Sequence, residues 1–148
     1  MWKCACFSLV FAAVMLAGFP GRAIALDVLI TEAEARLPPA RDEKPDSRGI
    51  TRGPRIVLQT ESPLRSPAHL QFKFQTFGGA KIDLASLRLT LRKTPDVDLT
   101  PRIKAFVQPE GIDIAEAGLP VGDFDLRMEL KDSDGRAAAK TFSLKVVQ

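Results

Sequence analysis

The sequence has few of the residues on which metal, disulfide and nucleophilic chemistry depend. It contains two cysteines, one tryptophan, one histidine and no tyrosine. Both cysteines and the tryptophan lie within the first six residues. A structural zinc site needs four ligands, mostly cysteine or histidine, and a disulfide framework needs cysteines spread along the chain. The composition therefore excludes a zinc centre and a disulfide-stapled scaffold, and it leaves any hydrolase of the triad kind with a single candidate base.

The N-terminus has the layout of a secretory signal peptide. Lys3 precedes an apolar run that extends from about Cys4 to Gly18, and an Ala-x-Ala pattern follows at Ala23 and Ala25. The run is shorter than the roughly 20 apolar residues of a transmembrane helix. No cysteine follows it, as a lipoprotein signal would require. We therefore predict a signal peptide over residues 1–25, with a retained N-terminal anchor as the alternative.

Removal of that leader would change the chemistry of the chain. No Cys, Trp or Tyr would be left, and stability would have to come from one apolar core, for which about 120 residues suffice. Lys3 and Arg22 would also be lost, so 21 basic residues become 19 against 18 acidic ones and the net charge falls from +3 to +1. We expect a periplasmic or secreted protein with no nucleic-acid partner and no stable membrane insertion after cleavage.

Residues 26–54 differ from the rest of the chain. Thr31 and Glu34 have the spacing of a capping box, which predicts a helix that runs to about Leu37, where Pro38 and Pro39 end it. The charged, Pro- and Gly-containing sequence RDEKPDSRGITRGP follows and is typical of a solvated linker or strap. An anionic docking patch on its arginines is the alternative.

From residue 55 onward, apolar and polar residues alternate with a period of two. Such alternation is typical of strands in antiparallel sheets with one buried and one wet face. The predicted inward residues are Leu70, Phe72, Phe74, Leu87, Leu89, Leu91, Phe124, Leu126, Met128, Leu130, Phe142, Leu144 and Val146.

The connecting segments carry turn signals at short intervals. ESPLRSP is predicted as a turn, GGAKIDLAS as a bend at the glycine pair, and GIDI as a short extra strand. Thr100 is expected to cap one or two helical turns that begin at Pro101. With no long amphipathic helix, the pattern predicts an all-β, two-sheet antiparallel sandwich over residues 55–148, preceded by the leader, the short helix and the Pro/Arg-rich strap.

The sequence LKDSDGRAA allows two interpretations. Asp and Gly favour a tight reversal between two alternating strands. Asp132 and Asp134 are alternatively weak candidates for a calcium site. Counted from Asp132, the sixth and twelfth positions hold Ala137 and Ser143, so the EF-hand pattern fails. The hairpin accounts for every residue, and a looser calcium site stays open as the alternative.

Two segments resemble bacterial Ig-like domains. IVLQTESPLRSPAHLQFKF is similar to their opening strands, and LPVGDFDLRMELKDSDGRAAAKTFSLKV is similar to their closing hairpin. The resemblance covers about residues 54–147 and implies an Ig-like β-sandwich in a small exported bacterial protein, a class whose members include proteins of unknown function. Phe124 stands where such domains often carry tyrosine. A shared fold implies no activity.

Candidate catalytic groups are few and are expected to be exposed. His69 begins an alternating strand on the side opposite Leu70. The aspartates at 123, 125, 96 and 98 form two pairs spaced by two residues, which could perform acid–base work but should be solvated. We therefore predict no enzyme, and an unrecognised carboxylate-dependent hydrolase is the least favoured alternative.

Surface residues give two further expectations. Phe77 and Phe106 lie outside the alternation, and packing under a loop is favoured over an exposed apolar spot. The row Arg88, Thr90, Arg92 and Lys93 could meet an acidic partner, although a solvated sheet face is favoured. Without exposed Trp or Tyr, sugar stacking is disfavoured.

The function predicted from the sequence is an exported, non-catalytic interaction or accessory module with an unidentified protein partner and no cofactor. Exposed sheet edges would supply its contacts, by adding a partner's strand. A calcium-stabilised structural or adhesion-type module is the alternative.

Overall fold

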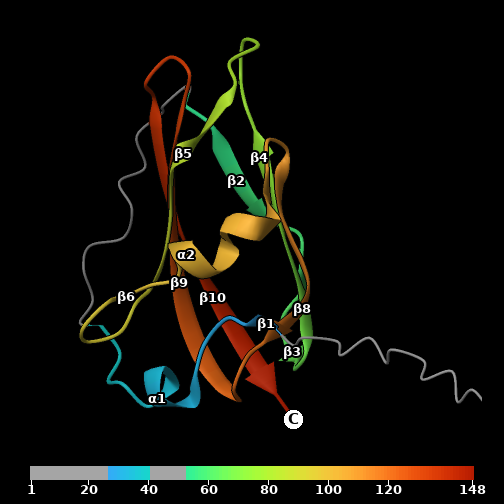
Figure 1. The fold of residues 1–148 in the computed structure, drawn as a ribbon, viewed down its shortest axis with the longest axis vertical. Coiled ribbons are helices and arrows are strands. Elements are labelled where there is room, and N and C mark those ends of the chain that lie inside the picture. Colours follow the sequence, from blue (N-terminus) through green and yellow to red (C-terminus); the bar gives the residue numbers. More distant parts are fainter. Residues whose placement is uncertain (1–26, 41–52) are drawn as a thin grey trace, which may run out of the picture.

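The computed structural model describes residues 27–40 and 53–148, and these form a sandwich of two β-sheets (Figure 1). The predicted cleavage residues Ala23 and Ala25 and most of the strap lie outside the described residues. Within the described ranges no helix is both long and apolar enough to cross a membrane.

The first sheet is built around β8. It has the order β1–β8–β4–β2, with β7 also paired to β8. Its strands are β1 (Asp27–Val28), β2 (Arg55–Leu58), β4 (Ala68–Gln75), β7 (Val107–Gln108) and β8 (Gly111–Gly118). The β1–β8 pair is parallel, and the β2–β4, β4–β8 and β7–β8 pairs are antiparallel.

The second sheet has the order β3–β10–β9–β5–β6. Its strands are β3 (Leu64–Arg65), β5 (Ile82–Leu91), β6 (Val97–Asp98), β9 (Gly122–Asp132) and β10 (Ala137–Val147). The short β3–β10 pair is parallel, and the long ladders are antiparallel. The sandwich is therefore antiparallel as predicted, apart from two parallel pairs of two residues each.

The strand order is that of an Ig-like domain. An Ig constant-type sandwich places strands A, B, E and D in one sheet and C, F and G in the other. Here β2, β4, β8 and β7 occupy the positions of A, B, E and D, and β5, β9 and β10 occupy those of C, F and G. The strand in the D position, β7, is only two residues long, so it covers only a small part of β8.

The predicted inward residues form the core. All thirteen are buried, and Phe72 of the first sheet meets Phe142 of the second edge to face at 5.3 Å between ring centroids. Each fully buried side chain of this kind contributes on the order of 1.5–3 kcal/mol by leaving water. The period-two pattern therefore specified the two inner faces correctly.

The N-terminal segment belongs to the same core. Leu29 and Ile30 are buried, at 3% and 2% exposure. The capping box is confirmed, because the Thr31 hydroxyl accepts from the Glu34 N–H and Glu34 Oε2 accepts from the Thr31 N–H. The helix is shorter than predicted, since α1 spans only Glu32–Ala35.

Beyond α1 the chain follows the edge of the second sheet. Pro39 forms an isolated antiparallel bridge with Lys93, and the Thr94 N–H donates to the Pro38 carbonyl at 2.8 Å. The residues between α1 and the predicted strap therefore pack on the sandwich.

Several local predictions were wrong in detail. Thr100 is not the N-cap of the helix after β6; it is the first residue of α2 (Thr100–Ile103), which the 3₁₀ turn η1 (Lys104–Phe106) continues. The cap residue is Leu99, and Asp98 satisfies the Thr100 N–H instead. The Thr100 hydroxyl is already used, because it accepts from the Leu89 N–H of β5.

The connectors also contain more strand than expected. GIDI is part of the eight-residue strand β8, ESPLRSP contains β3, and GGAKIDLAS contains the start of β5. Leu64 of β3 is buried against the core, so a segment read as a turn contributes to the packing.

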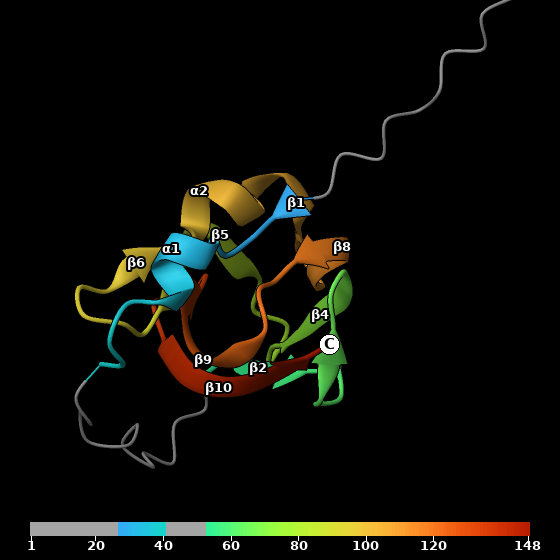
Figure 2. The same ribbon diagram turned by 90° about the horizontal axis from the view of Figure 1, so that it is seen from below.

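The helices lie together on one side of the molecule. Figure 2 shows α1, α2 and β1 on the same side of the sandwich, between β6 and β8. Ile103 of α2 is fully buried, which anchors this layer on the core. The layer lies beside the outer edge of β8.

Candidate functional site

The candidate catalytic residues are spread over the surface. His69 is exposed, as predicted, and its Nε2 lies 2.6 Å from Asp113 Oδ1 on the neighbouring strand β8. Gln71 donates to the other oxygen of Asp113 at 3.3 Å. The pair lies on the open outer face of the first sheet, with both side chains about half exposed.

The two aspartate pairs also occupy exposed positions. Asp125 accepts a hydrogen bond from the Ser143 hydroxyl, and Asp123 lies opposite Lys145 in the β9–β10 ladder. Asp98 accepts from the Thr100 N–H, and hydrogen bonding by Thr100 lowers the pKa of Asp98. The side chains of Asp96, Asp98 and Asp125 have local structural partners, and no contact among the described residues pairs any of the four aspartates with a second carboxylate.

The LKDSDGRAA segment forms the predicted hairpin between β9 and β10. Asp132 is buried, and its carboxylate accepts from the backbone N–H groups of Asp134 and Arg136 and from the Arg136 guanidinium. Burial raises the pKa of Asp132, but the hydrogen bonds from Arg136 and Asp134 outweigh it and the net shift is downward.

Arg136 also bears on the calcium alternative. It contacts Asp134 as well as Asp132, so a guanidinium occupies the position between the two candidate ligands. No group of three or more metal-binding side chains occurs in the ranges 27–40 and 53–148. The calcium site stays an untested prediction.

The basic row at the end of β5 and just beyond it is less solvated than expected. Arg88 is exposed, but the side chain of Arg92 is only 13% exposed and lies 3.6 Å from Asp96. Lys93 donates to the Ala35 carbonyl and lies 5.5 Å above the Phe124 ring. The N-terminal segment therefore covers part of this row.

Phe77 and Phe106 have different environments. Phe77 is 49% exposed beside the glycine pair, so its predicted packing under a loop was wrong. Phe106 is half-buried against the core and lines a pocket. The two rings do not form one apolar spot.

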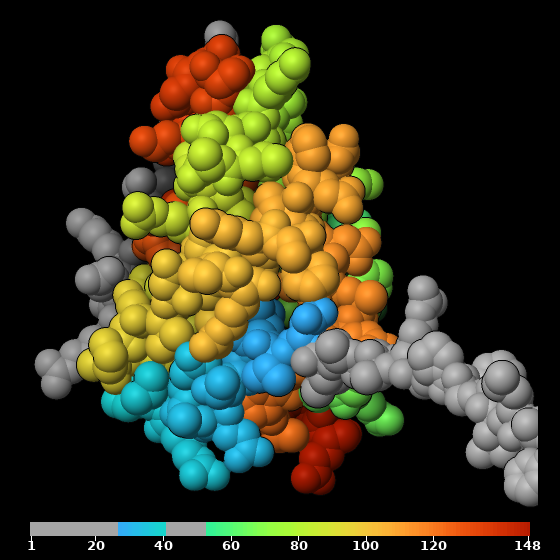
Figure 3. Space-filling model, viewed as in Figure 1, coloured from blue at the N-terminus to red at the C-terminus, as the bar shows by residue number. Residues whose placement is uncertain are grey.

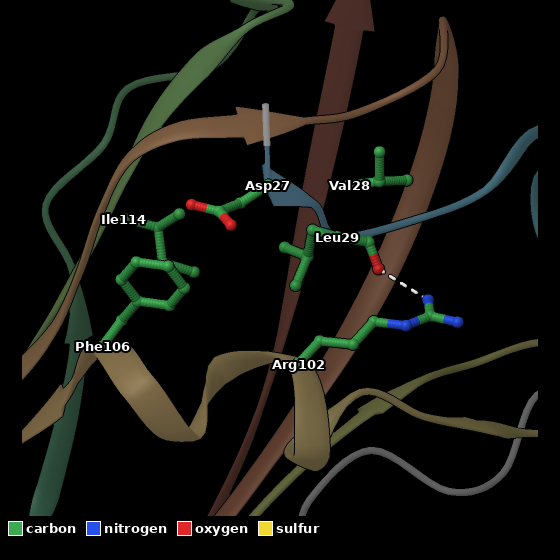
Figure 4. A pocket seen from close by; sticks show the side chains of 6 residues that line it. All are labelled: Asp27, Val28, Leu29, Arg102, Phe106 and Ile114. Carbon is green, nitrogen blue, oxygen red and sulfur yellow. Dashed lines mark hydrogen bonds between the residues drawn. The ribbon is translucent and has the colours of Figure 1, made fainter. Parts of the chain in front are cut away.

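That pocket lies at the outer edge of β8. Its volume is about 240 Å³, and it is lined by Asp27, Val28, Leu29, Arg102, Phe106 and Ile114 (Figure 4). The lining residues come from β1 and the following residue, from α2 and η1, and from β8. Figure 3 shows these segments meeting on one face, with the N-terminal segment in blue, the helical turns in gold and β8 in orange.

The edge of β8 is open between its two short neighbours. β7 pairs with Gly111 and Ile112, and β1 pairs with Ala117 and Gly118. Within the part of the chain that the structure describes, no strand pairs with this edge over residues 113–116. Ala115 lies in the middle of the opening and is exposed.

The ladder phase sets the direction of the free backbone groups. The Phe74 N–H donates to the Glu110 carbonyl, and in the same register Phe72 lies opposite Ile112 and Leu70 opposite Ile114. Hydrogen-bonded and non-hydrogen-bonded pairs alternate in an antiparallel ladder. In this phase the N–H and C=O of Asp113 point away from β4. The register shifts between the Leu70–Ile114 and Ala68–Ala117 pairs, so Ala115 and Glu116 lie in an irregularity of the ladder to which the phase does not extend.

An ion pair holds the pocket wall in place. Arg102 binds Glu34 with two hydrogen bonds of 2.8 and 2.7 Å, and it also donates to the Leu29 carbonyl at 2.8 Å. The guanidinium thereby joins α2 to the residue that follows β1 and to α1. Hydrogen bonding to Arg102 lowers the pKa of Glu34 to about 2, and the same contact raises the pKa of Arg102.

We expect this ion pair to make stability dependent on acid pH. The pKa of Glu34 is about 2 in the folded protein and near its ordinary value of 4.5 when the protein is unfolded. Because the folded pKa is depressed, the contribution is complete above about pH 4.5 and is lost as the pH falls toward 2. After allowance for solvent at the pocket rim, its size should be about 1–2 kcal/mol.

Urea unfolding at pH 6 and pH 2.5 measures this effect against Glu34→Gln. The free energy of unfolding should fall further with acid in the unmodified protein than in the variant, by that amount. An identical pH dependence in the two proteins would show that the ion pair is not formed in solution.

Sequence reasoning missed this site almost entirely. Asp27, Arg102 and Ile114 are far apart in the sequence, and only the fold brings them together. Two features of the sequence pointed toward the site. Phe106 lies outside the strand alternation, and GIDI was predicted as a strand without an assigned partner strand. Neither signal could indicate that β1 and β7 would leave an opening between them.

Comparisons with known proteins return only distant structural similarity. No protein-family model and no curated protein matches the chain. CopC from Methylosinus trichosporium OB3b is 14% identical, with a TM-score of 0.39 over 62% of this chain and 93% of that chain. Murine CRIg is 9% identical, with a TM-score of 0.37 over 62% and 96%. At these scores the similarity says nothing about function, and the fold assignment rests on the strand order.

Proposed function

We propose that this protein is an exported, non-catalytic interaction module that binds an extended segment of a partner protein at the open edge of β8. The observation that carries the proposal is the gap between β1 and β7, a stretch of the β8 edge centred on Ala115 that no described strand pairs with and that lies beside a pocket. An exposed edge of this kind is a template for a further strand, and strand addition is a common mode of peptide recognition.

The length of the gap limits what can bind. Four residues at about 3.3 Å each give roughly 13 Å of free edge. A partner segment can therefore pair over three or four residues before it must bend away from β1 or β7. Binding by so few main-chain hydrogen bonds needs a side-chain contact as well, and the adjacent pocket offers one.

Export and domain organisation belong to the same proposal. The leader predicted at residues 1–25 supports a periplasmic or secreted location, in which the partner is an exported protein. We divide the remainder into the helix and strap at 26–54 and the Ig-like domain at 55–148. The burial of Leu29 and Ile30 supports the view that residues 27–40 fold as one unit with that domain.

Site-specific crosslinking in the source cells tests the proposal. A photo-crosslinking amino acid at position 115 should capture one protein, and the crosslinks should map to one contiguous segment of it. The matched control is position 139, an exposed alanine on β10 of the other sheet. Equal yields from the two positions, or no product from position 115, would overturn the proposal.

A further inference from the structure

We propose that the pocket beside β8 binds a single lysine or arginine side chain, whose charged head lies at Asp27. The inference rests on the proposed function, because the side chain would be carried by the extended segment that pairs with Ala115. It adds the chemical identity of the bound residue, which the edge geometry alone does not specify.

The size of the pocket fits one long side chain. Pockets for drug-sized ligands and cofactors are commonly about 300–1,000 Å³, and this one holds about 240 Å³. Leu29, Phe106 and Ile114 give it an apolar lining, of which Leu29 and Ile114 are buried. An aliphatic stem can pack on such a surface while its polar head reaches the rim.

The charges at the pocket favour a cation. The positive charge of Arg102 is already balanced by Glu34, and its remaining contact is to the Leu29 carbonyl. The backbone of Asp27 pairs with β8, but no described residue forms an ion pair or hydrogen bond with its side chain. Among the described residues, the negative charge of this carboxylate is therefore uncompensated.

The directions of the side chains support the same conclusion. Figure 4 shows the Asp27 carboxylate directed toward Ile114 and Phe106, whereas the Arg102 guanidinium is directed away, toward the Leu29 carbonyl. A basic head group placed beside Asp27 would thus meet a carboxylate and the Phe106 ring. The ring adds a cation–π attraction of about 0.5–1 kcal/mol at an exposed site.

Other occupants fit less well. An apolar side chain would take water from the Asp27 carboxylate without supplying a partner, which is unfavourable. An acidic side chain would repel it. The pocket therefore selects a basic residue at one position of the bound segment, while strand pairing at Ala115 is tolerant of sequence.

A titration with defined peptides tests this selection. The probes are acetylated and amidated heptapeptides of alternating serine and valine, identical except at the central position, which is arginine, lysine, methionine or glutamate. Binding to the purified protein is followed by the amide chemical shifts of Ala115 and its neighbours. We expect the arginine and lysine peptides to bind at least 10-fold more tightly than the methionine peptide, and the glutamate peptide to bind weakest.

The variant Asp27→Asn provides the decisive comparison. It should abolish the preference for arginine and lysine, both by weakening those two peptides and by relieving the cost of the methionine peptide, and added salt should reduce the preference in the unmodified protein. Asp123→Asn, an exposed aspartate on the other sheet, should have no effect.

The outcomes separate this inference from the function on which it rests. Equal binding of the arginine, lysine and methionine peptides, or a preference that survives Asp27→Asn, would overturn the basic-residue site and leave strand addition standing. Absence of shifts at Ala115 with every peptide would overturn both.

Discussion

Replacing Ile30 with alanine should lower the free energy of unfolding by about 2–4 kcal/mol, as for any buried core residue. Ile30 is 2% exposed and packs in the same hydrophobic cluster as the sandwich strands. The alanine variant would lose this contact and leave a cavity between the N-terminal segment and the core. Chemical denaturation of the variant measures the loss.

Two further variants serve as references for a large and a small loss of stability. Leu126→Ala, in the centre of β9, should cost a comparable amount, because Leu126 is fully buried. Val28→Ala should cost less than about 0.5 kcal/mol, because Val28 is 51% exposed. If Ile30→Ala resembles Val28→Ala, the N-terminal segment does not fold cooperatively with the sandwich, and the wall of the pocket is not fixed.

A proline at position 115 should abolish binding of the partner segment. Proline removes the Ala115 N–H that would pair with the partner segment, and its ring occupies the space in which the added strand would lie. At a strand edge whose N–H faces outward, proline is tolerated, so the stability of the fold should change little. We expect at least a 10-fold loss of affinity for the captured segment, measured by titration with a synthetic copy of it.

The matched control is Ala115→Val, which keeps the N–H and favours the extended backbone. It should bind the segment nearly as well as the unmodified protein. If Ala115→Pro binds normally while its unfolding curve is unchanged, the segment does not pair with β8 and the contact lies elsewhere.

The alternation of apolar residues was sufficient to predict most of the fold. Residues such as Phe72, Leu126 and Leu144 were assigned to the core because side-chain direction in a strand is set locally. The ends of elements depended on competing partners and were less predictable. Thr100 has the side chain of an N-cap, but the Leu89 N–H of a neighbouring strand takes its hydroxyl.

The site could not be predicted from the sequence, because it lies on the part of the β8 edge that the short strands β1 and β7 do not cover. Nothing local distinguishes Ala115 from the other exposed strand residues, and its place in the opening follows only from the registers of β1 and β7. Arg102 likewise gives no sign in the sequence that Glu34, 68 residues away, will be its partner. Such information is carried by tertiary packing.

Amide hydrogen exchange at Ala115 tests the central claim most directly. Exchange should be measured residue by residue in the purified protein, with the amide of Ile114, which pairs with β4, as the internal reference. The account predicts that the Ala115 amide exchanges freely while Ile114 is protected, and that Ala115 becomes protected when the partner segment binds. Protection of Ala115 equal to that of Ile114 in the free protein would mean that the edge is already occupied, and would contradict the account.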